Sequence, residues 1–168
     1  ELEEIIVTAQ KRAESLQDVP ISMSALSGST IKDNGIHSFQ DLSGYVPNLE
    51  IAENAVNTII TMRGIGIGSN QSFEQSVGIY VDGVHFGKSR QVRSGLFDVE
   101  QVEVLRGPQG ILFGKNTLAG AINVTTASAN VGDEFSGGID VSQESYNGQI
   151  VDAHIAGSVT CLLYTSPS

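Results

Sequence analysis

The segment LRGPQGILFGKNTLAG, residues 105–120, carries the residue types of a phosphate-binding loop. In such a loop, glycine amides cradle the phosphates, a lysine reaches them and a hydroxyl holds magnesium, in the order G-x-x-x-x-G-K-[ST]. Here Gly110 stands one residue too close to Gly114, and Asn116 replaces the hydroxyl after Lys115. The spacing therefore argues against a nucleotide site, and the glycines need another explanation.

Other residues with catalytic or ligating chemistry form no recognisable site. Arg63–Gly68 has glycine at alternate positions but does not meet the dinucleotide fingerprint G-x-G-x-x-G, so we expect a long polar loop. The single Cys161 cannot form an internal disulfide, and no cysteine and histidine group has zinc-site spacing. A serine-hydrolase elbow, G-x-S-x-G, is also missing. We predict no enzyme, no cofactor and no metal site, and expect surface or strand positions for His37, His85 and His154.

Composition narrows the class of protein. A chain of 168 residues has the length of a single domain, and its 19 glycines favour strands, turns and loops over helices. Nineteen acidic and nine basic residues give a net charge of -10, whereas a nucleic-acid-binding protein would carry a basic footprint. No apolar run approaches the roughly 18 residues of a membrane helix. We therefore expect no nucleic-acid partner and no spanning helix.

The acidic N-terminal region contains one β-branched run, Glu4–Ala9. It reads as a strand, and the segment after it reads as helix and turn, so it has no sequential neighbour to pair with. One interpretation is an edge strand of the domain's own sheet. The other is a terminal segment that stays mobile until it adds to the sheet edge of another protein.

Two short helices are expected next. Ser27–Asn34 can form a helix that ends at Gly35, a residue suited to the left-handed position. A second helix begins at Ser38, with Asp41 three residues on as an approximate capping box, and Pro47 stops it. We expect one side of a small sheet to be covered by Ile36, Phe39, Leu42 and Val46.

The middle of the chain reads as strands and turns. Val77–Lys88 is predicted to be a hairpin with a type I′ turn at Asp82-Gly83, which would place Val81 opposite Val84 and Ile79 opposite Phe86. A helical turn closed by Gly114 is expected at residues 108–113. The other expected strands are 57–62, 102–105 and 121–125.

From Gly138 the sequence alternates with a period of two, apolar at odd and polar at even positions. To keep the faces separate, we predict a three-residue loop at 146–148 that pairs Ile139 with Ile155 and Val141 with Ala153. Such a hairpin occurs in transmembrane barrels, and also half-buried in soluble proteins. The tail 161–168 drops the alternation, and we interpret it as non-native.

Together these segments resemble one family, the plug domain of TonB-dependent outer-membrane receptors. The resemblance covers about residues 4–159 and is most specific at VEVLRGPQGILFGKNT, 102–117, followed by GAIN, 120–123. Supporting stretches are IVTA at 6–9, DVPI at 18–21, MRG at 62–64 and YVDG at 80–83. The departures are Ile111, where the family usually has a small or hydroxyl residue, and Ala119, where it usually has glycine. In this family the glycine-rich stretch is structural, so the resemblance removes Lys115 as a phosphate ligand.

The resemblance implies an α+β fold: a small mixed sheet with short helices and long loops, followed by a β-hairpin of a transmembrane barrel. It divides the chain into a mobile TonB-box segment (1–12), a plug (13–135), the first barrel hairpin (136–160) and the tail. The barrel of such receptors has about 22 strands, so we expect a fragment that cannot transport alone. Its expected place is the outer membrane of a Gram-negative bacterium, with the plug inside the barrel lumen and facing the periplasm.

The resemblance also implies partners and site residues. TonB would bind an extended handle made by Glu4, Ile5, Ile6, Val7, Thr8 and Ala9, and a proline at Val7 would weaken that complex. Barrel glutamates would pair with Arg63 and Arg106, which should be more exposed in the fragment than in the receptor. A ligand such as a siderophore or other metal chelate, haem, cobalamin or an oligosaccharide would meet two polar loops, 67–75 and 85–93, through Ser69, Asn70, Gln71, Phe73, Phe86, Lys88 and Arg90. The rival hypothesis is a periplasmic protein-binding module, secretin-like or adhesive, without a barrel.

Overall fold

A computed structural model describes residues 5–8, 14–17, 19–53, 58–66, 75–93, 95–96, 98–127, 136–143, 148–160 and 163–165. Contacts divide the chain into two compact units, Glu1–Thr126 and Ala127–Ser168. Each unit is described by itself. No helix among the described residues is long and apolar enough to cross a membrane.

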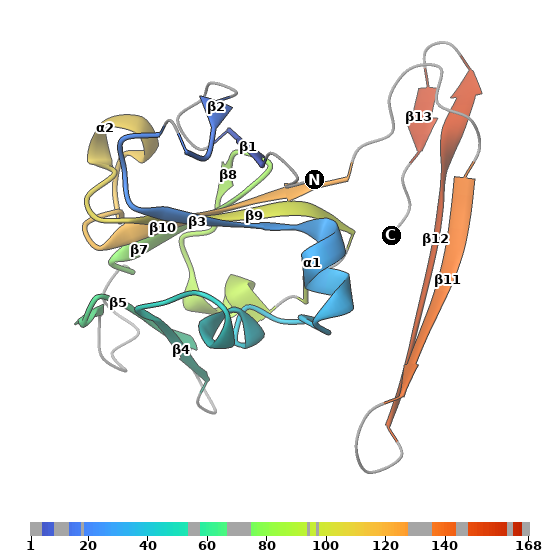
Figure 1. Cartoon of the computed structure of the whole chain (residues 1–168), viewed down its shortest axis with the longest axis horizontal. Coiled ribbons are helices and arrows are strands. Elements are labelled where there is room, and N and C mark those ends of the chain that lie inside the picture. The colour runs from blue at the N-terminus through green and yellow to red at the C-terminus, as the bar shows by residue number, and fades with distance from the viewer. Residues whose placement is uncertain are drawn as a thin grey trace. The chain divides into compact units, whose positions relative to one another are not determined.

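The first unit is built on a five-stranded mixed sheet (Figure 1). Its strands, in spatial order, are β3 (Met23–Ser27), β9 (Val99–Arg106), β10 (Gly120–Thr126), β7 (Val77–Val81) and β8 (Val84–His85). β7 and β10 run parallel, and the other neighbours are antiparallel. The small mixed sheet predicted from the sequence is therefore confirmed.

Both faces of the central strands are buried. On β9, Val102 and Val104 belong to the main core, whereas Leu105 belongs to a second, smaller cluster. On β10, Ile122 lies in the main core and Ala121 in the smaller cluster. Because successive side chains of a strand point to opposite faces, these strands need a covering layer on each side.

One covering layer lies below the sheet in Figure 1 and encloses the main core. It contains α1 (Gly28–Asp33), the 3-10 helices η1 (Asp41–Gly44) and η2 (Ser89–Arg93), and a three-stranded sheet of β4 (Leu49–Glu53), β5 (Thr58–Met62) and β6 (Ile65–Gly66). The side chains predicted to cover the sheet are all buried here: Ile36, Phe39, Leu42 and Val46.

The helix end at Gly35 and the box of Ser38 and Asp41 form as the sequence predicts, and Ser27 adds an N-cap that was not predicted. The Ser27 hydroxyl accepts a hydrogen bond from the Thr30 amide at 3.3 Å, and Gly35 adopts a left-handed φ of 61° after the helix. The Ser38 amide donates to the Asp41 carboxylate at 2.9 Å, and the Asp41 amide donates to the Ser38 hydroxyl at 3.3 Å. The helix after this reciprocal box is only the 3-10 turn η1.

The β7–β8 hairpin also matches its prediction. Asp82 and Gly83 have φ values of 48° and 78°, as a type I′ turn requires. Val81 pairs with Val84, and the Phe86 amide donates to the Ile79 carbonyl at 2.8 Å. The predicted register of this hairpin is therefore confirmed.

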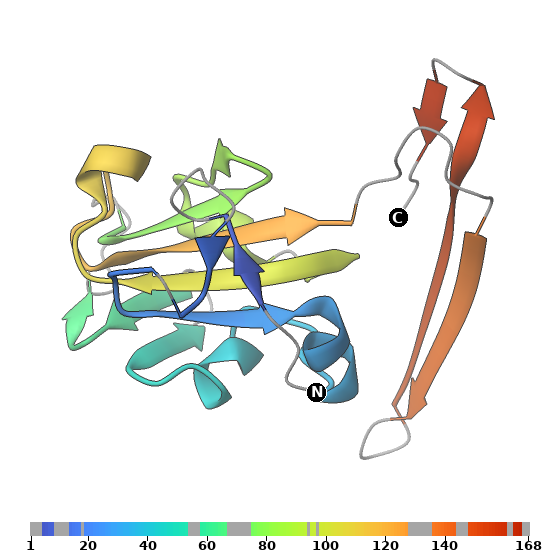
Figure 2. The ribbon, with the colours of Figure 1, turned by 45° about the horizontal axis from the view of Figure 1, so that its top comes forward.

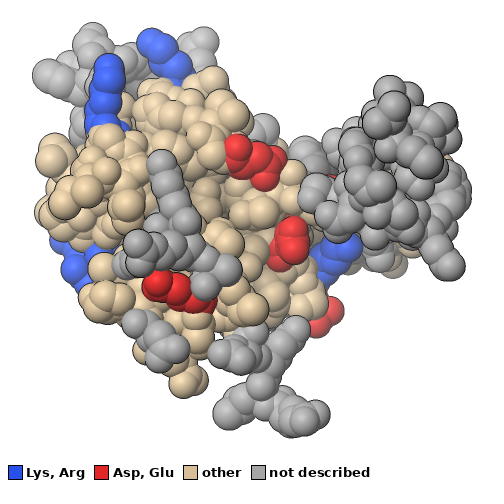
Figure 3. All heavy atoms as spheres, turned by 90° about the horizontal axis from the view of Figure 1, so that it is seen from above, with Lys and Arg blue, Asp and Glu red and all other residues tan. Residues whose placement is uncertain are grey.

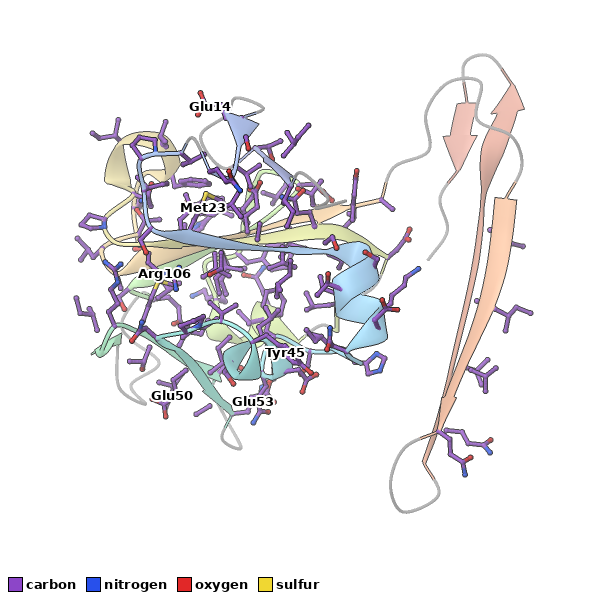
Figure 4. The ribbon with its side chains drawn as sticks, in the orientation of Figure 1. Glu14, Met23, Tyr45, Glu50, Glu53 and Arg106 are labelled. Carbon is purple, nitrogen blue, oxygen red and sulfur yellow. The ribbon has the colours of Figure 1, made fainter. Side chains whose placement is uncertain are left out.

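In the five-stranded sheet and the sheet of the covering layer, three strands were not predicted: β3, β4 and β6. The expectation of a long polar loop at Arg63–Gly68 was wrong at its start, because Arg63 and Gly64, with φ values of 52° and 77°, make a tight turn that pairs Ile65 with Met62. Residues 67–68 lie outside the described part. The signal missed in β4 was alternation: Leu49 and Ile51 are buried, and Glu50 between them points away from the central sheet (Figure 4).

The second unit is a three-stranded antiparallel sheet of β11 (Ser136–Gln143), β12 (Gln149–Thr160) and β13 (Leu163–Thr165). The predicted hairpin exists, but its predicted register was wrong by two residues: Ile139 pairs with Ala153, and Val141 with Val151. A shift of two keeps every side chain on its face, so alternation alone could not distinguish the two registers. Residues 144–147 of the loop lie outside the described part. β13 lies in the tail and pairs Gly157 with Thr165.

Candidate functional site

The upper face of the central sheet is covered by the N-terminal segment (Figure 2). There β1 (Ile6–Val7) pairs antiparallel with β2 (Glu14–Ser15) in a separate two-stranded sheet. Val7 is 1% exposed, whereas Ile6 is 55% exposed. The expectation that this run has no sequential neighbour was wrong, because β2, a strand without β-branched residues, provides one. β1 is also no edge strand of the central sheet.

The two edges of β1 have different partners. The Leu16 amide donates to the Ile5 carbonyl at 3.0 Å, so the backbone of Ile5 faces β2. In an antiparallel ladder the hydrogen-bonding residues alternate, so the backbone groups of Ile6 and Thr8 face away from β2. We call this second side, defined by the Ile6 carbonyl and the Thr8 amide, the outer edge.

Side chains from β9 occupy the outer edge. The Gln101 amide donates to the Ile6 carbonyl at 3.0 Å. The Thr8 amide donates to the Glu103 carboxylate, and the Thr8 hydroxyl approaches the same oxygen at 3.4 Å. An amide donor and a carboxylate acceptor thus take the places that a neighbouring strand would fill.

Glu103 is the most buried charged residue of the described part, with no solvent exposure. Asn123 donates to its second oxygen at 2.9 Å, and Gln101 approaches its first oxygen at 3.3 Å. A buried carboxylate is tolerated only when donors replace its lost hydration. Here those donors come from the N-terminal segment, from β9 itself and from β10.

The two predicted plug arginines have different surroundings. Arg63 is exposed at the tight β5–β6 turn. Arg106 is half-buried, and its guanidinium donates to the carbonyls of Met23 at 3.0 Å and Pro47 at 3.2 Å, while its Nε is buried without a partner in the described part. Figure 4 shows Arg106 reaching from the end of β9 toward the lower layer. It therefore ties β9 to the chain entering β4.

The glycine-rich segment uses its own amides. Around α2 (Gly110–Phe113), the Gly107 amide donates to Ala119, the Gln109 amide to Thr117 and the Gly114 amide to Gly110, at 2.9 to 3.0 Å. Those amides are therefore not available to cradle a phosphate, and Lys115 is exposed. The arrangement agrees with the structural role that the resemblance implies.

Tyr80 anchors α2 to the sheet. Its hydroxyl donates to the Phe113 carbonyl, and the two rings lie 4.8 Å apart between centroids. Burial raises the pKa of the Tyr80 phenol above its ordinary value, which keeps this donor protonated.

Of the seven residues predicted to contact a ligand, the structure describes the side chains of two, Phe86 and Lys88. Phe86 is half-buried and packs against the main core. Lys88 is exposed, and its amide donates to the Gln91 side chain at 3.0 Å. The described part does not include Glu4, Ala9, Ser69, Asn70, Gln71, Phe73 or the side chain of Arg90. His37 and His85 are exposed, as predicted.

Sequence reasoning missed Gln101 and Glu103. One signal was present: Glu103 is a charged residue inside an apolar run, with Val102 before it and Val104 after it. A charge inside such a run marks a buried polar contact. Its partner Thr8, 95 residues away in the chain, could not be read from spacing.

The face of the molecule drawn in Figure 3 shows no basic patch that could bind a polyanion. On the face seen in Figure 3, the coloured Lys and Arg side chains are scattered and do not merge into a basic patch. This agrees with the net charge of -10.

The chain is similar in sequence to a known protein family and to several of its members. The model of the TonB-dependent receptor plug domain family matches residues 15–121. The pesticin receptor of Yersinia pestis is 32% identical over 169 residues, which cover 94% of this chain and 25% of the receptor. The vitamin B12 transporter BtuB of Vibrio vulnificus is 30% identical and covers 74% of this chain and 21% of the transporter.

One solved structure is similar to this chain in both sequence and fold. The crystal structure of the ferric yersiniabactin uptake receptor FyuA from Yersinia pestis superposes with a TM-score of 0.73 at 31% identity. It covers 83% of this chain and 22% of the receptor. The chain therefore spans about a quarter of the length of the curated relatives it matches.

Proposed function

Since the chain belongs to the TonB-dependent receptor plug domain family, we propose that it is the plug of an outer-membrane receptor for active uptake. In this proposal the plug closes a barrel in the outer membrane of a Gram-negative bacterium and faces the periplasm. It contributes to the binding of a siderophore-type ligand or another scarce nutrient, and it couples to TonB. The relatives are transport receptors, and we propose no catalytic activity.

The observation that carries the proposal is that β1 is not a strand of the central sheet. Among the described residues its backbone pairs only with the two-residue strand β2, and its outer edge is held by side chains of β9, not by the backbone of another strand. Such a segment can leave the domain without breaking the central sheet. We propose that Glu4–Ala9 is the handle, and that TonB takes it up by adding it to a sheet edge through main-chain hydrogen bonds.

The second unit supports a barrel. Four apolar side chains on one face of the hairpin are 54% to 73% exposed in this chain: Ile139, Val141, Val151 and Ile155. Alternation with an apolar outer face is the pattern of a barrel strand against lipid. We propose that these residues face the membrane, and that Arg63 and Arg106 meet glutamates on the inside of the barrel.

Ligand contact is proposed for the two polar loops. Of the contact residues predicted there, the side chains of Phe86 and Lys88 are described, and the exposed ammonium of Lys88 can meet an anionic ligand. The pesticin receptor, the ferric yersiniabactin receptor and the vitamin B12 transporter carry names with different ligands. We therefore propose the class of scarce nutrient, with a siderophore-type ligand as its leading member.

The first test is calorimetry of a peptide of residues 1–12 with the periplasmic domain of a cognate TonB. Proline at Val7 or at Thr8 removes an amide donor, and the two donors face opposite edges of the strand. We expect specific binding that at least one of these prolines weakens by about fivefold or more, because one hydrogen bond contributes about 1 kcal/mol.

Val7→Ala is the matched control, since it shortens the side chain and keeps the amide donor. A peptide that binds equally well with either proline would contradict the handle assignment. Failure of the unmodified peptide to bind would contradict coupling to TonB and favour the periplasmic protein-binding module.

A further inference from the structure

We propose that Gln101 and Glu103 act as an edge cap on β1: a partner strand can pair with the outer edge only after both side chains have released it. This inference rests on the proposed function and adds the regulation of the handle. It names two residues of β9 that hold the handle closed.

The cap satisfies the same backbone atoms that a partner strand would need. In β-augmentation, an incoming strand donates to one carbonyl and accepts from an amide two residues along the same edge. On β1 these groups are the Ile6 carbonyl, which accepts from Gln101 at 3.0 Å, and the Thr8 amide, which donates to Glu103. Each partner hydrogen bond therefore replaces one hydrogen bond of the cap.

The other edge of β1 is closed as well. β2 pairs there, with Val7 opposite Glu14, and the Leu16 amide bonds the Ile5 carbonyl. Val7 itself is 1% exposed. In the conformation described, hydrogen bonds therefore occupy groups on both edges of β1, and the Val7 side chain is buried.

The cap belongs to the central sheet and not to the handle. Asn123 on β10 holds the second carboxylate oxygen of Glu103 at 2.9 Å, and Gln101 approaches the first at 3.3 Å. These contacts remain when β1 leaves. The cap thus stays in place, ready to capture β1 again, so the docked state competes with the partner at every encounter.

The inference predicts a difference between the chain and its own N-terminal peptide. The peptide has no cap, so we expect it to bind the TonB periplasmic domain more tightly than the 168-residue chain does. Gln101→Ala should tighten binding of the chain by about fivefold, and Glu103→Ala by about tenfold or more, because a bond to a charged group contributes more than a neutral one. Glu100→Ala is the matched control, since it removes an exposed carboxylate from the same strand.

Hydrogen exchange of the Thr8 amide in the chain alone supplies a second readout that needs no partner. We expect faster exchange in Glu103→Ala and, to a smaller extent, in Gln101→Ala, and no change in Glu100→Ala. If Glu103→Ala fails to fold, Gln101→Ala still decides, because its side chain is only half-buried.

The outcomes separate the cap from the function. If peptide and chain bind equally and Gln101→Ala changes nothing, the cap is overturned while coupling to TonB stands. If the peptide does not bind at all, the proposed function fails, and the Thr8 exchange rates decide the cap alone: unchanged rates in both variants would overturn it.

Discussion

Three glycines of one segment, Gly110, Gly114 and Gly120, should respond differently to the same added methyl group. If the glycine-rich stretch serves the fold, the response follows from the backbone and neighbours of each glycine. If the stretch served a phosphate, the three would share one role in binding. Substitution of each by alanine therefore tests the structural explanation.

Gly120 should be the most sensitive. It is buried at the start of β10, where a Cβ would run into the Leu105 carbonyl oxygen of β9 and the Met62 sulfur. The sulfur can move, but the carbonyl oxygen is part of the neighbouring strand. Overpacking of a core costs about 1 to 3 kcal/mol. Because one clash is with backbone, we expect Gly120→Ala to lower the free energy of unfolding by about 3 kcal/mol.

The other two glycines have open space around a Cβ. Gly114 has φ 81° and ψ -136°, a backbone conformation that alanine adopts only with strain, so Gly114→Ala should cost about 2 kcal/mol. Gly110 begins α2 without a left-handed φ, and nothing lies within 4 Å of its Cβ. There alanine reduces the entropy of the unfolded chain, so Gly110→Ala should stabilise by about 0.5 to 1 kcal/mol.

Urea unfolding of the 168-residue chain and its three variants, followed by circular dichroism, gives the midpoints that rank them. Gly110→Ala is the matched control for the other two, since it adds the same methyl group in the same segment. The reasoning would be refuted by equal losses at all three positions, or by a loss at Gly110 as large as that at Gly120.

Two further predictions concern single hydrogen bonds. Tyr80→Phe removes the donor to the Phe113 carbonyl and should lower the free energy of unfolding by about 1 kcal/mol in urea titrations. The raised pKa of Tyr80 means that the folded state holds this proton more tightly, so its contribution to stability should be fully present below pH 10 and fall as the pH rises above it. The free energy of unfolding of Tyr80→Phe should fall less over the same pH range. An equal fall in both proteins would assign the effect to other groups. Ser27→Ala removes the cap of α1 and should cost about 1 kcal/mol in thermal unfolding, whereas Ser29→Ala, at an exposed helix position, should cost less; a larger loss at Ser29 would contradict the cap.

Local features could be predicted where neighbouring residues set the geometry. The Asp82-Gly83 turn, the helix end at Gly35 and the reciprocal bonds of Ser38 and Asp41 each involve residues within a few positions of one another. Their backbone conformations follow from turn and cap chemistry. The predicted register of β11 with β12 was wrong because side chains alternate between the two faces with a period of two residues. A shift of the pairing by two residues therefore leaves every side chain on the same face.

The candidate site was predictable only in part. The sequence singled out Glu4–Ala9 as an extended run and Arg63 and Arg106 as arginines that end strands. It did not reveal that Arg106 bonds the carbonyls of Met23 and Pro47, since both are backbone groups without a sequence signature. It also did not reveal β2, whose two residues have little preference for a strand and pair because β1 lies beside them.

The sequence by itself determined the class of the domain, through its glycine-rich turns, its apolar strands and the motif between Val102 and Asn123. Those features are local, and short-range sterics and hydrogen bonding decide them. Only the tertiary structure decided what closes β1, because Glu103 and Thr8 are separated by 95 residues and meet only when β9 takes its place between β3 and β10 in the sheet. A buried carboxylate must find donors wherever folding brings them, and no pattern in the sequence records which donors those are.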